Sequence, residues 1–145
     1  MKKTDINKVE KALNIKLPKY YIDTLVKHNE ALESIDANLF FFNDAQILIA
    51  ENELMREPAF SGIDWDNNIL VIGNNFCGKY YCIDVTSIKQ IVFSYERETK
   101  KLMHYKNSIS EWCDELLNNH EYEQKEFENE LRNQDVLLEN DIIDE

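Results

Sequence analysis

The sequence predicts a single α/β (α+β) domain, with a mixed or antiparallel central sheet, N-terminal helices and a long C-terminal helix. Three observations lead to this prediction. Two apolar runs flank a turn-rich loop at 69–85, apolar residues recur at helical spacing near the N-terminus, and a helix-start signal stands at Ser108. The chain has 145 residues, 43% of them hydrophobic, and this size suits one domain with one core.

The two apolar runs at 69–72 and 80–85 predict a β-hairpin. Nearly every position in them is apolar, so both strands are expected to be central strands that are covered on both faces. Gly73 and Gly78 bound the loop between the runs, and Asn74-Asn75 suits its turns. Because the loop has no phosphate-binding pattern, we expect the hairpin to be core rather than active site.

A first helix is expected from a cap at Thr4 to about Leu13. Ile6 and Val9 share helical spacing with Leu13, and Asn14 suits the left-handed position that ends a helix. Pro18 suits the first turn of a second helix that closes near residue 29. Its apolar stripe consists of Tyr21, Ile22, Leu25 and Val26.

The run 39–42, with three consecutive phenylalanines, predicts a buried strand. Asp44 is expected to cap a third helix that continues to about Arg56 and that Pro58 stops, and residues 57–68 are expected to form a loop. The predicted stripe of this helix is Ile47, Ala50 and Leu54, with Leu48 and Met55 beside it.

Residues 91–95 and 102–105 predict a second hairpin at the sheet edge, where the charged link between them protects against strand addition. Ser108 and Glu111 then form a capping box, in which each side chain accepts a bond from a backbone N–H at a helix start. Apolar spacing allows one long helix to about residue 133, but Asn118-Asn119 is a point where it can bend into two. Both alternatives remain open.

Charge is distributed unevenly along the chain. Residues 1–110 carry 15 acids and 14 bases, whereas residues 111–145 carry 13 acids and only two bases. We therefore expect a globular body at 1–120 and an acidic extension of the last helix at 121–145, within the same domain. Such a segment repels nucleic acid and anionic membranes, so neither is expected as a direct partner.

A cytoplasmic location is expected, because no membrane-length apolar run or secretory signal is present. The spacings of Cys77, Cys82 and Cys113 match neither a redox pair nor a zinc framework. The thiols are expected to be reduced, with Cys82 and Cys113 buried and Cys77 accessible.

Three motifs occur together in this chain: L-P-K-Y-Y at 17–21, D-W-D at 64–66, and I-G-x-x-x-x-G-x-Y-Y-x-I-D at 72–84. In this order and spacing they resemble the SUKH superfamily, Smi/Knr type, over about residues 9–112. The resemblance implies a non-catalytic α/β domain that in bacteria commonly serves as an immunity protein, which binds and neutralises a cognate toxin. The eukaryotic branch of the superfamily implies an alternative, a regulatory or scaffold module with no toxin partner.

Catalytic, metal and cofactor sites are not expected. A nucleophile at Cys77 with His104 or His28 has no supporting motif around it. His120 and Glu123 form only one helical pair, and the D-W-D acids lack calcium-loop spacing.

The acidic helix is the best functional candidate. Nine acids in the 25 residues 111–135 place one carboxylate about every 4 Å along a helix, close to the roughly 3.4 Å charge spacing of one nucleic-acid strand. This predicts a fit to the basic groove of a nuclease-type toxin, although the acids can equally serve only to keep a surface helix soluble.

The residues predicted to contact the partner are aromatic anchors and acids of this helix, and the protein is expected to be a monomer or weak homodimer. Trp65 has two interpretations, an exposed anchor or a plug at the end of the core. The predicted set is Trp65, Phe76, Glu115, Glu121, Tyr122, Glu123, Glu126, Glu128 and Glu130.

Overall fold

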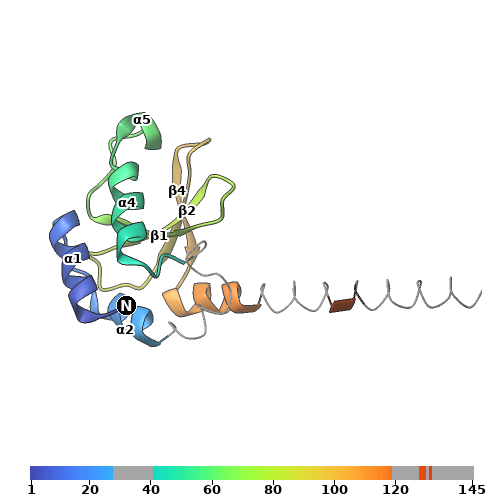
Figure 1. The fold of residues 1–145 in the computed structure, drawn as a ribbon. Coiled ribbons are helices and arrows are strands. Elements are labelled where there is room, and N and C mark those ends of the chain that lie inside the picture. Colours follow the sequence, from blue (N-terminus) through green and yellow to red (C-terminus); the bar gives the residue numbers. More distant parts are fainter. Residues whose placement is uncertain (28–40, 119–127, 130, 132–145) are drawn as a thin grey trace, which may run out of the picture.

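The computed structural model describes residues 1–27, 41–118, 128, 129 and 131. These residues form an α+β domain built on a four-stranded antiparallel sheet, in which the strand order is β1-β2-β3-β4 (Figure 1). The predicted fold class is confirmed. The boundary predicted at residue 120 lies outside the described residues and stays a prediction.

The strands are β1 (Ile69–Asn74), β2 (Lys79–Asp84), β3 (Val92–Glu96) and β4 (Lys101–Lys106). Both predicted hairpins are therefore confirmed. One expectation was wrong, because β1 is an outer strand in the order rather than a central one. It is nevertheless buried from its second residue to its last.

The outer edge of β1 is closed by side-chain and backbone groups from elsewhere in the fold. The Val71 N–H donates to Asn52 Oδ1 at 2.7 Å, and the Val71 carbonyl accepts from Asn52 Nδ2 at 2.8 Å. Next to them, Phe41 bridges Gly73, and the Phe42 N–H donates to the Ile72 carbonyl at 2.9 Å. Of the strand predicted at 39–42, the structure describes only these two buried phenylalanines, which form a bridge rather than a strand.

Helix α1 (Lys3–Leu13) buries Ile6, Val9 and Leu13, as the spacing predicts. Asn14 follows with φ 53°, in the left-handed conformation expected of it. The predicted cap at Thr4 was wrong, since the helix begins at Lys3 and no side chain caps its start.

Helix α2 (Lys19–Lys27) follows Pro18, whose carbonyl accepts from the Tyr21 and Ile22 N–H groups. Its buried face differs from the predicted stripe, because Val26 is 62% exposed and Thr24 is buried instead. The Thr24 hydroxyl donates to the Tyr20 carbonyl at 2.8 Å, and this bond allows a polar residue to face the core.

Helix α4 (Ala45–Met55) is capped by Asp44, as predicted, because its carboxylate accepts from the Ile47 N–H at 3.0 Å. The predicted stripe was in the wrong phase. Ala50 and Leu54 are exposed, and the buried face consists of Leu48, Asn52 and Met55. The segment 57–68 was also predicted wrongly as loop throughout, because α5 (Pro58–Ser61) forms one helical turn with proline at its start.

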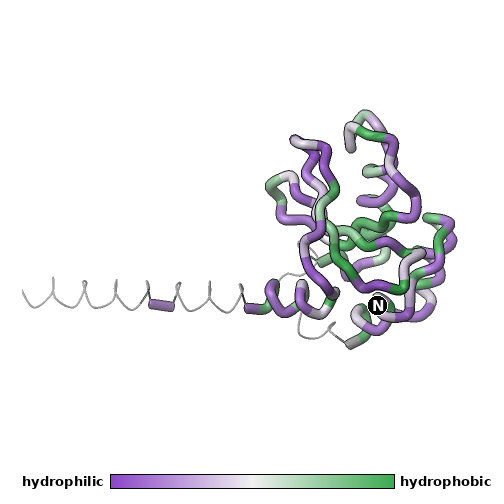
Figure 2. Tube along the Cα trace, turned by 180° about the vertical axis from the view of Figure 1, so that it is seen from behind, coloured by the Kyte–Doolittle hydropathy of each residue, from purple (hydrophilic) through white to green (hydrophobic). Residues whose placement is uncertain are grey.

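Helices cover both faces of the sheet. Tyr80 and Tyr81 are neighbours on β2 and therefore point to opposite faces. Phe60 of α5 meets Tyr80 with ring centroids 6.3 Å apart, whereas Trp112 meets Tyr81 at 5.2 Å. Figure 2 shows the hydrophobic residues gathered along the middle strands between these layers and hydrophilic residues toward the hairpin tips.

The last helix is described over residues 109–118 and begins where the sequence predicts. The Glu111 N–H donates to Ser108 Oγ at 3.2 Å, and the Glu111 carboxylate accepts from the Asn107 N–H at 3.3 Å. This reciprocal pair confirms the predicted cap, with Glu111 reaching one residue further back than the motif requires. The continuation predicted to about residue 133 lies largely outside the described residues.

Candidate partner-binding surface

Trp65 belongs to the core. Its side chain is 6% exposed, its indole N–H donates to the Ile69 carbonyl at 2.9 Å, and its ring meets Tyr95 edge-on at 4.9 Å. The second interpretation, a plug at the end of the core, therefore describes its position. We correct the expectation that Trp65 is a partner anchor, because a side chain enclosed in this way offers no surface for a partner.

Phe76 is displayed on the loop between β1 and β2. It is 59% exposed and has φ 61°, which is unusual for a residue with a side chain. Two asparagines build the loop around it. Asn74 Oδ1 accepts from the Phe76 N–H at 3.1 Å, and Asn75 Oδ1 accepts from the Cys77 and Lys79 N–H groups at 2.8 and 3.0 Å. The loop therefore has the turn residues that the sequence predicts, and Phe76 stays in the predicted contact set.

Glu115 is engaged inside the domain. Its carboxylate accepts a 2.7 Å bond from the Tyr105 hydroxyl and lies 3.4 Å from Lys106 Nζ. The ammonium groups of Lys79 and Lys106 lie 5.1 and 5.3 Å from the centroid of the Tyr105 ring. Burial, and then the bond to Glu115, raise the pKa of Tyr105. Glu115 thus joins the last helix to β4, which is a structural role that the sequence did not suggest.

The other acids of the predicted surface lie mostly beyond what the structure describes. Glu128 is helical and exposed. Glu121, Tyr122, Glu123, Glu126 and Glu130 lie outside the described residues, so an acidic interface made by them stays a prediction.

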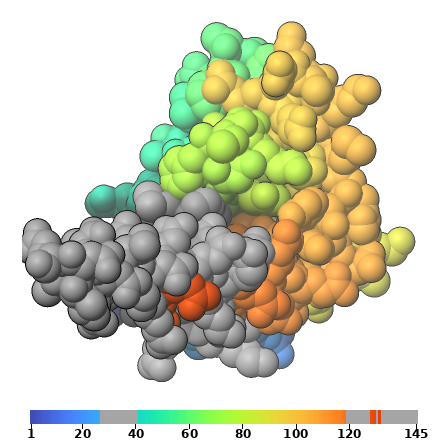
Figure 3. Space-filling view, turned by 90° about the vertical axis from the view of Figure 1, so that its right-hand side faces the viewer, coloured from blue at the N-terminus to red at the C-terminus, as the bar shows by residue number. Residues whose placement is uncertain are grey.

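A different surface, along β4, was missed by the sequence prediction. Leu102 is 43% exposed and Met103 is 61% exposed in the middle of this strand. Lys100 and Lys101 lie at its start and Lys106 at its end. In Figure 3 the β1–β2 loop, in yellow-green, lies in front, and residues 96–118, in gold to orange, lie above it and along one flank. The signal in the sequence is K-K-L-M-H-Y-K, in which two apolar residues stand between bases. The charged link before this strand was expected to protect the edge against strand addition, but Leu102 and Met103 are nevertheless exposed.

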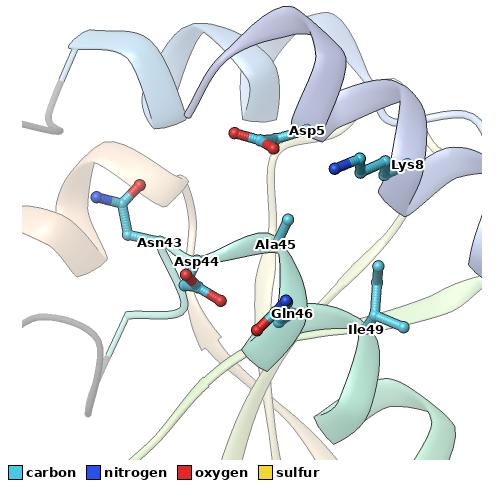
Figure 4. A pocket seen from close by; sticks show the side chains of 7 residues that line it. All are labelled: Asp5, Lys8, Asn43, Asp44, Ala45, Gln46 and Ile49. Carbon is cyan, nitrogen blue, oxygen red and sulfur yellow. The ribbon is translucent and has the colours of Figure 1, made fainter.

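A polar pocket of about 360 Å³ lies between α1 and the start of α4 (Figure 4). Its charged lining residues are Asp5, Lys8 and Asp44, so it does not concentrate charge of one sign. Asp44 is already engaged as the helix cap. Nothing in this lining combines a nucleophile with a base.

Residues 1–115 match the SMI1 / KNR4 family (SUKH-1). The chain belongs to this family. The match covers the whole sheet and the start of the last helix, and it confirms the resemblance that the three motifs indicate. No curated protein and no solved structure matches the chain.

Within this SUKH-1 domain the cysteines lie where the sequence predicts. Cys77 is exposed, whereas Cys82 and Cys113 are buried. Burial raises the pKa of Cys113 to about 12 and raises that of Cys82 further. At neutral pH both buried thiols are therefore protonated, and they act as small core side chains.

The acids that flank Trp65 lie in the loop before β1. Asp66 Oδ1 accepts from the Asn68 N–H at 2.9 Å, and Asp64 is exposed. Over the described parts of the chain, no three His, Cys, Asp or Glu side chains are grouped so that they can hold a metal ion. None of the helices in those same parts is long and apolar enough to cross a bilayer.

Proposed function

We propose that this SUKH-1 domain is a cytoplasmic, non-catalytic immunity protein that neutralises a cognate bacterial toxin by stoichiometric binding. Membership of the family over residues 1–115 is the observation that carries the proposal. The partner is a protein, and this chain acts on it as a monomer or weak homodimer without a cofactor.

The charge distribution suggests that the toxin is basic and of the nuclease type. Residues 111–145 carry 13 acids and two bases, against a nearly balanced body. A segment of this charge speeds encounter with a basic surface, and the effect weakens as salt screens it. It can occupy a groove that otherwise takes a nucleic-acid strand.

Charge alone does not account for tight binding. Each exposed ion pair contributes only about 0.2–1 kcal/mol, so the interface also requires an aromatic or aliphatic anchor that loses its water on binding. Among the predicted aromatic contacts that the structure describes, Phe76 is the exposed candidate, because Trp65 lies in the core.

The proposal is tested with the purified product of the neighbouring gene as the candidate toxin. The expected result is a 1:1 complex by light scattering and loss of toxin activity at equimolar protein. Association should slow several-fold between about 50 and 200 mM salt, as the charges are screened.

The matched variants differ only in where acids are neutralised. In one variant Glu121, Glu123, Glu126, Glu128 and Glu130 become Gln, and in the other the exposed body acids Asp23, Glu53, Glu57, Asp64 and Glu98 become amides. Only the variant with Gln in the acidic segment should associate with the toxin more slowly. No complex at low salt would overturn the proposal and favour the regulatory or scaffold alternative, and equal binding by both variants would overturn the acidic interface.

A further inference from the structure

The two outer strands of the sheet, β1 and β4, differ in whether other groups of the protein pair with their outer edges. The edge of β1 is closed by Asn52 and by the two phenylalanines at 41–42. Over the described part of the chain, nothing pairs with the outer side of β4. An open edge presents a row of backbone donors and acceptors to any extended chain that can fit against it.

The side chains of β4 determine which extended segments can pair with its open edge. Lys101 to His104 are all exposed, and successive residues of a strand point to opposite faces. Leu102 and Met103 therefore offer apolar surface on both sides of the edge. An added strand would cover both of them while its backbone pairs with β4.

The ends of β4 are basic. Lys100 and Lys101 lie at one end and Lys106 at the other, and the strand itself contains no acid. The salt bridges found among the described residues join Lys79 with Glu96 and Lys106 with Glu115, and neither involves Lys100 or Lys101. Lys101 lies opposite Glu96 in the register with β3, but neither Lys100 nor Lys101 is within ion-pair distance of an acid in the described part of the domain.

This charge pattern argues against a second copy of β4 as the occupant. An antiparallel pair of β4 strands centred between Met103 and His104 would place Lys101 opposite Lys106 at both ends. Like charges directly opposite each other are destabilising in an antiparallel pair. A segment with acids at both ends would instead form opposite-charge pairs there.

We propose that the open edge of β4 is a strand-addition site for an extended segment of a protein partner, in which apolar residues are flanked by Asp or Glu. The proposal does not depend on the acidic surface and does not require the partner to be a toxin, although Glu115 of the last helix contacts Tyr105 and Lys106 at one end of β4. A partner that uses both surfaces must present basic charge to one and an acid-flanked strand to the other, which would fix its orientation.

The test is a titration of the full ¹⁵N-labelled chain with a blocked peptide, Asp-Val-Thr-Val-Thr-Asp, followed by NMR. The expected result is saturable shifts confined to the amides of β4 and its immediate neighbours, with slower hydrogen exchange of the outward-facing β4 amides. The matched peptide Lys-Val-Thr-Val-Thr-Lys should bind roughly three- to ten-fold more weakly.

A charge-swapped variant provides a second test, in which two peptides are compared on the same protein. A change in stability would affect both peptides alike. In Lys100→Glu/Lys101→Glu both changes are at exposed positions, and the preference between the two peptides should disappear or reverse.

The proposal is overturned if neither peptide shifts β4 at millimolar concentration or if both bind wild type equally. It is also overturned if β4 amides are already protected in dilute protein, or if they shift with protein concentration alone, which would assign the edge to this chain or to a second copy. Failure here leaves toxin binding through the acidic segment untouched.

Discussion

Asn52 is a buried amide that joins helix α4 to the outer edge of β1. It is 2% exposed on the face of α4 that packs against the sheet. Its side chain satisfies both the N–H and the carbonyl of Val71 and also donates to the Leu48 carbonyl at 2.8 Å. The amide thus replaces the strand that would otherwise pair with this part of β1, which is why a polar residue is tolerated in the core.

Replacing Asn52 with Leu should destabilise the domain. The new side chain has a similar volume, but it leaves the Val71 N–H and carbonyl buried without a partner, at about 1–3 kcal/mol for each group. We expect the free energy of unfolding to fall by about 2–5 kcal/mol, measured by urea denaturation. Asn7→Leu on the exposed face of α1 is the matched control and should change it by less than about 0.5 kcal/mol. Equal effects of the two changes would show that the bridge to Val71 contributes little.

Cys82 should make the stability of the domain depend on pH in the alkaline range. Burial holds its pKa well above the ordinary value of 9.0, so the folded state keeps a proton that the unfolded state releases. Above about pH 9 the unfolded state therefore binds fewer protons, and stability falls as pH rises, by up to about 1.4 kcal/mol per pH unit for one thiol.

The measurement is urea denaturation of wild type and Cys82→Ala between pH 8 and 10.5. The variant should be less stable at pH 8, because it loses core volume, yet its stability should decline less steeply with pH. Parallel declines for the two proteins would contradict a protonated, buried Cys82.

At the scale of elements, α4 is positioned by its ends and by its neighbour. Asp44 determines where the helix begins, and Pro58 begins the next helical turn shortly after it ends. Its apolar residues surround much of the helix, so the spacing alone allows more than one buried face. Contact with β1 through Asn52 selects the face that includes Leu48 and Met55.

Removing the cap of α4 should cost a moderate amount of stability. In Asp44→Ala the Ile47 N–H loses its 3.0 Å acceptor, and loss of such a cap typically lowers the free energy of unfolding by about 0.5–2 kcal/mol. The control is Asp64→Ala, which removes an exposed acid from a loop. A shift in the thermal midpoint for Asp44→Ala alone is expected, and an equal shift in both would indicate a general charge effect instead.

At the scale of the whole molecule, charge and fold are partitioned along the chain. The body to residue 110 carries 15 acids and 14 bases, and the remainder carries most of the net charge of −12. The family match ends at residue 115, close to where the excess of acids begins. We therefore expect folding and partner attraction to depend on different parts of the chain.

Truncation after residue 120 tests this partition. Association with the toxin should slow, and its salt dependence should flatten, because the steering charges are removed. Stopped-flow mixing at several salt concentrations measures both effects, and far-UV circular dichroism of the remaining domain should keep its strand signal. If truncation unfolds the domain instead, residues 121–145 are part of the core and the partition is wrong.

Local patterns in the sequence were sufficient for the elements whose ends depend on their own residues. The two hairpins, the caps at Asp44 and Ser108 and the left-handed Asn14 follow from turn chemistry and periodicity, which act over a few residues. Burial of Cys82 likewise follows from its apolar neighbours.

The sequence predicted less well which residues of the candidate partner-binding surface are exposed. Phe76 is exposed as expected, because it lies in a polar turn, but Trp65 turned inward and Glu115 turned toward Tyr105. Whether a loop tryptophan or a helix acid faces solvent depends on which distant side chains lie opposite it. No local pattern carries that information.

The amino-acid order by itself determined the antiparallel hairpins, the caps and the acidic bias of the last 35 residues, since these depend on interactions between near neighbours or on composition alone. Only the tertiary structure decided that Asn52 closes one edge of the sheet while β4 stays open at the other. These are contacts between segments that folding brings together, and their stability comes from burial and hydrogen bonds that do not exist until the helices lie on the sheet.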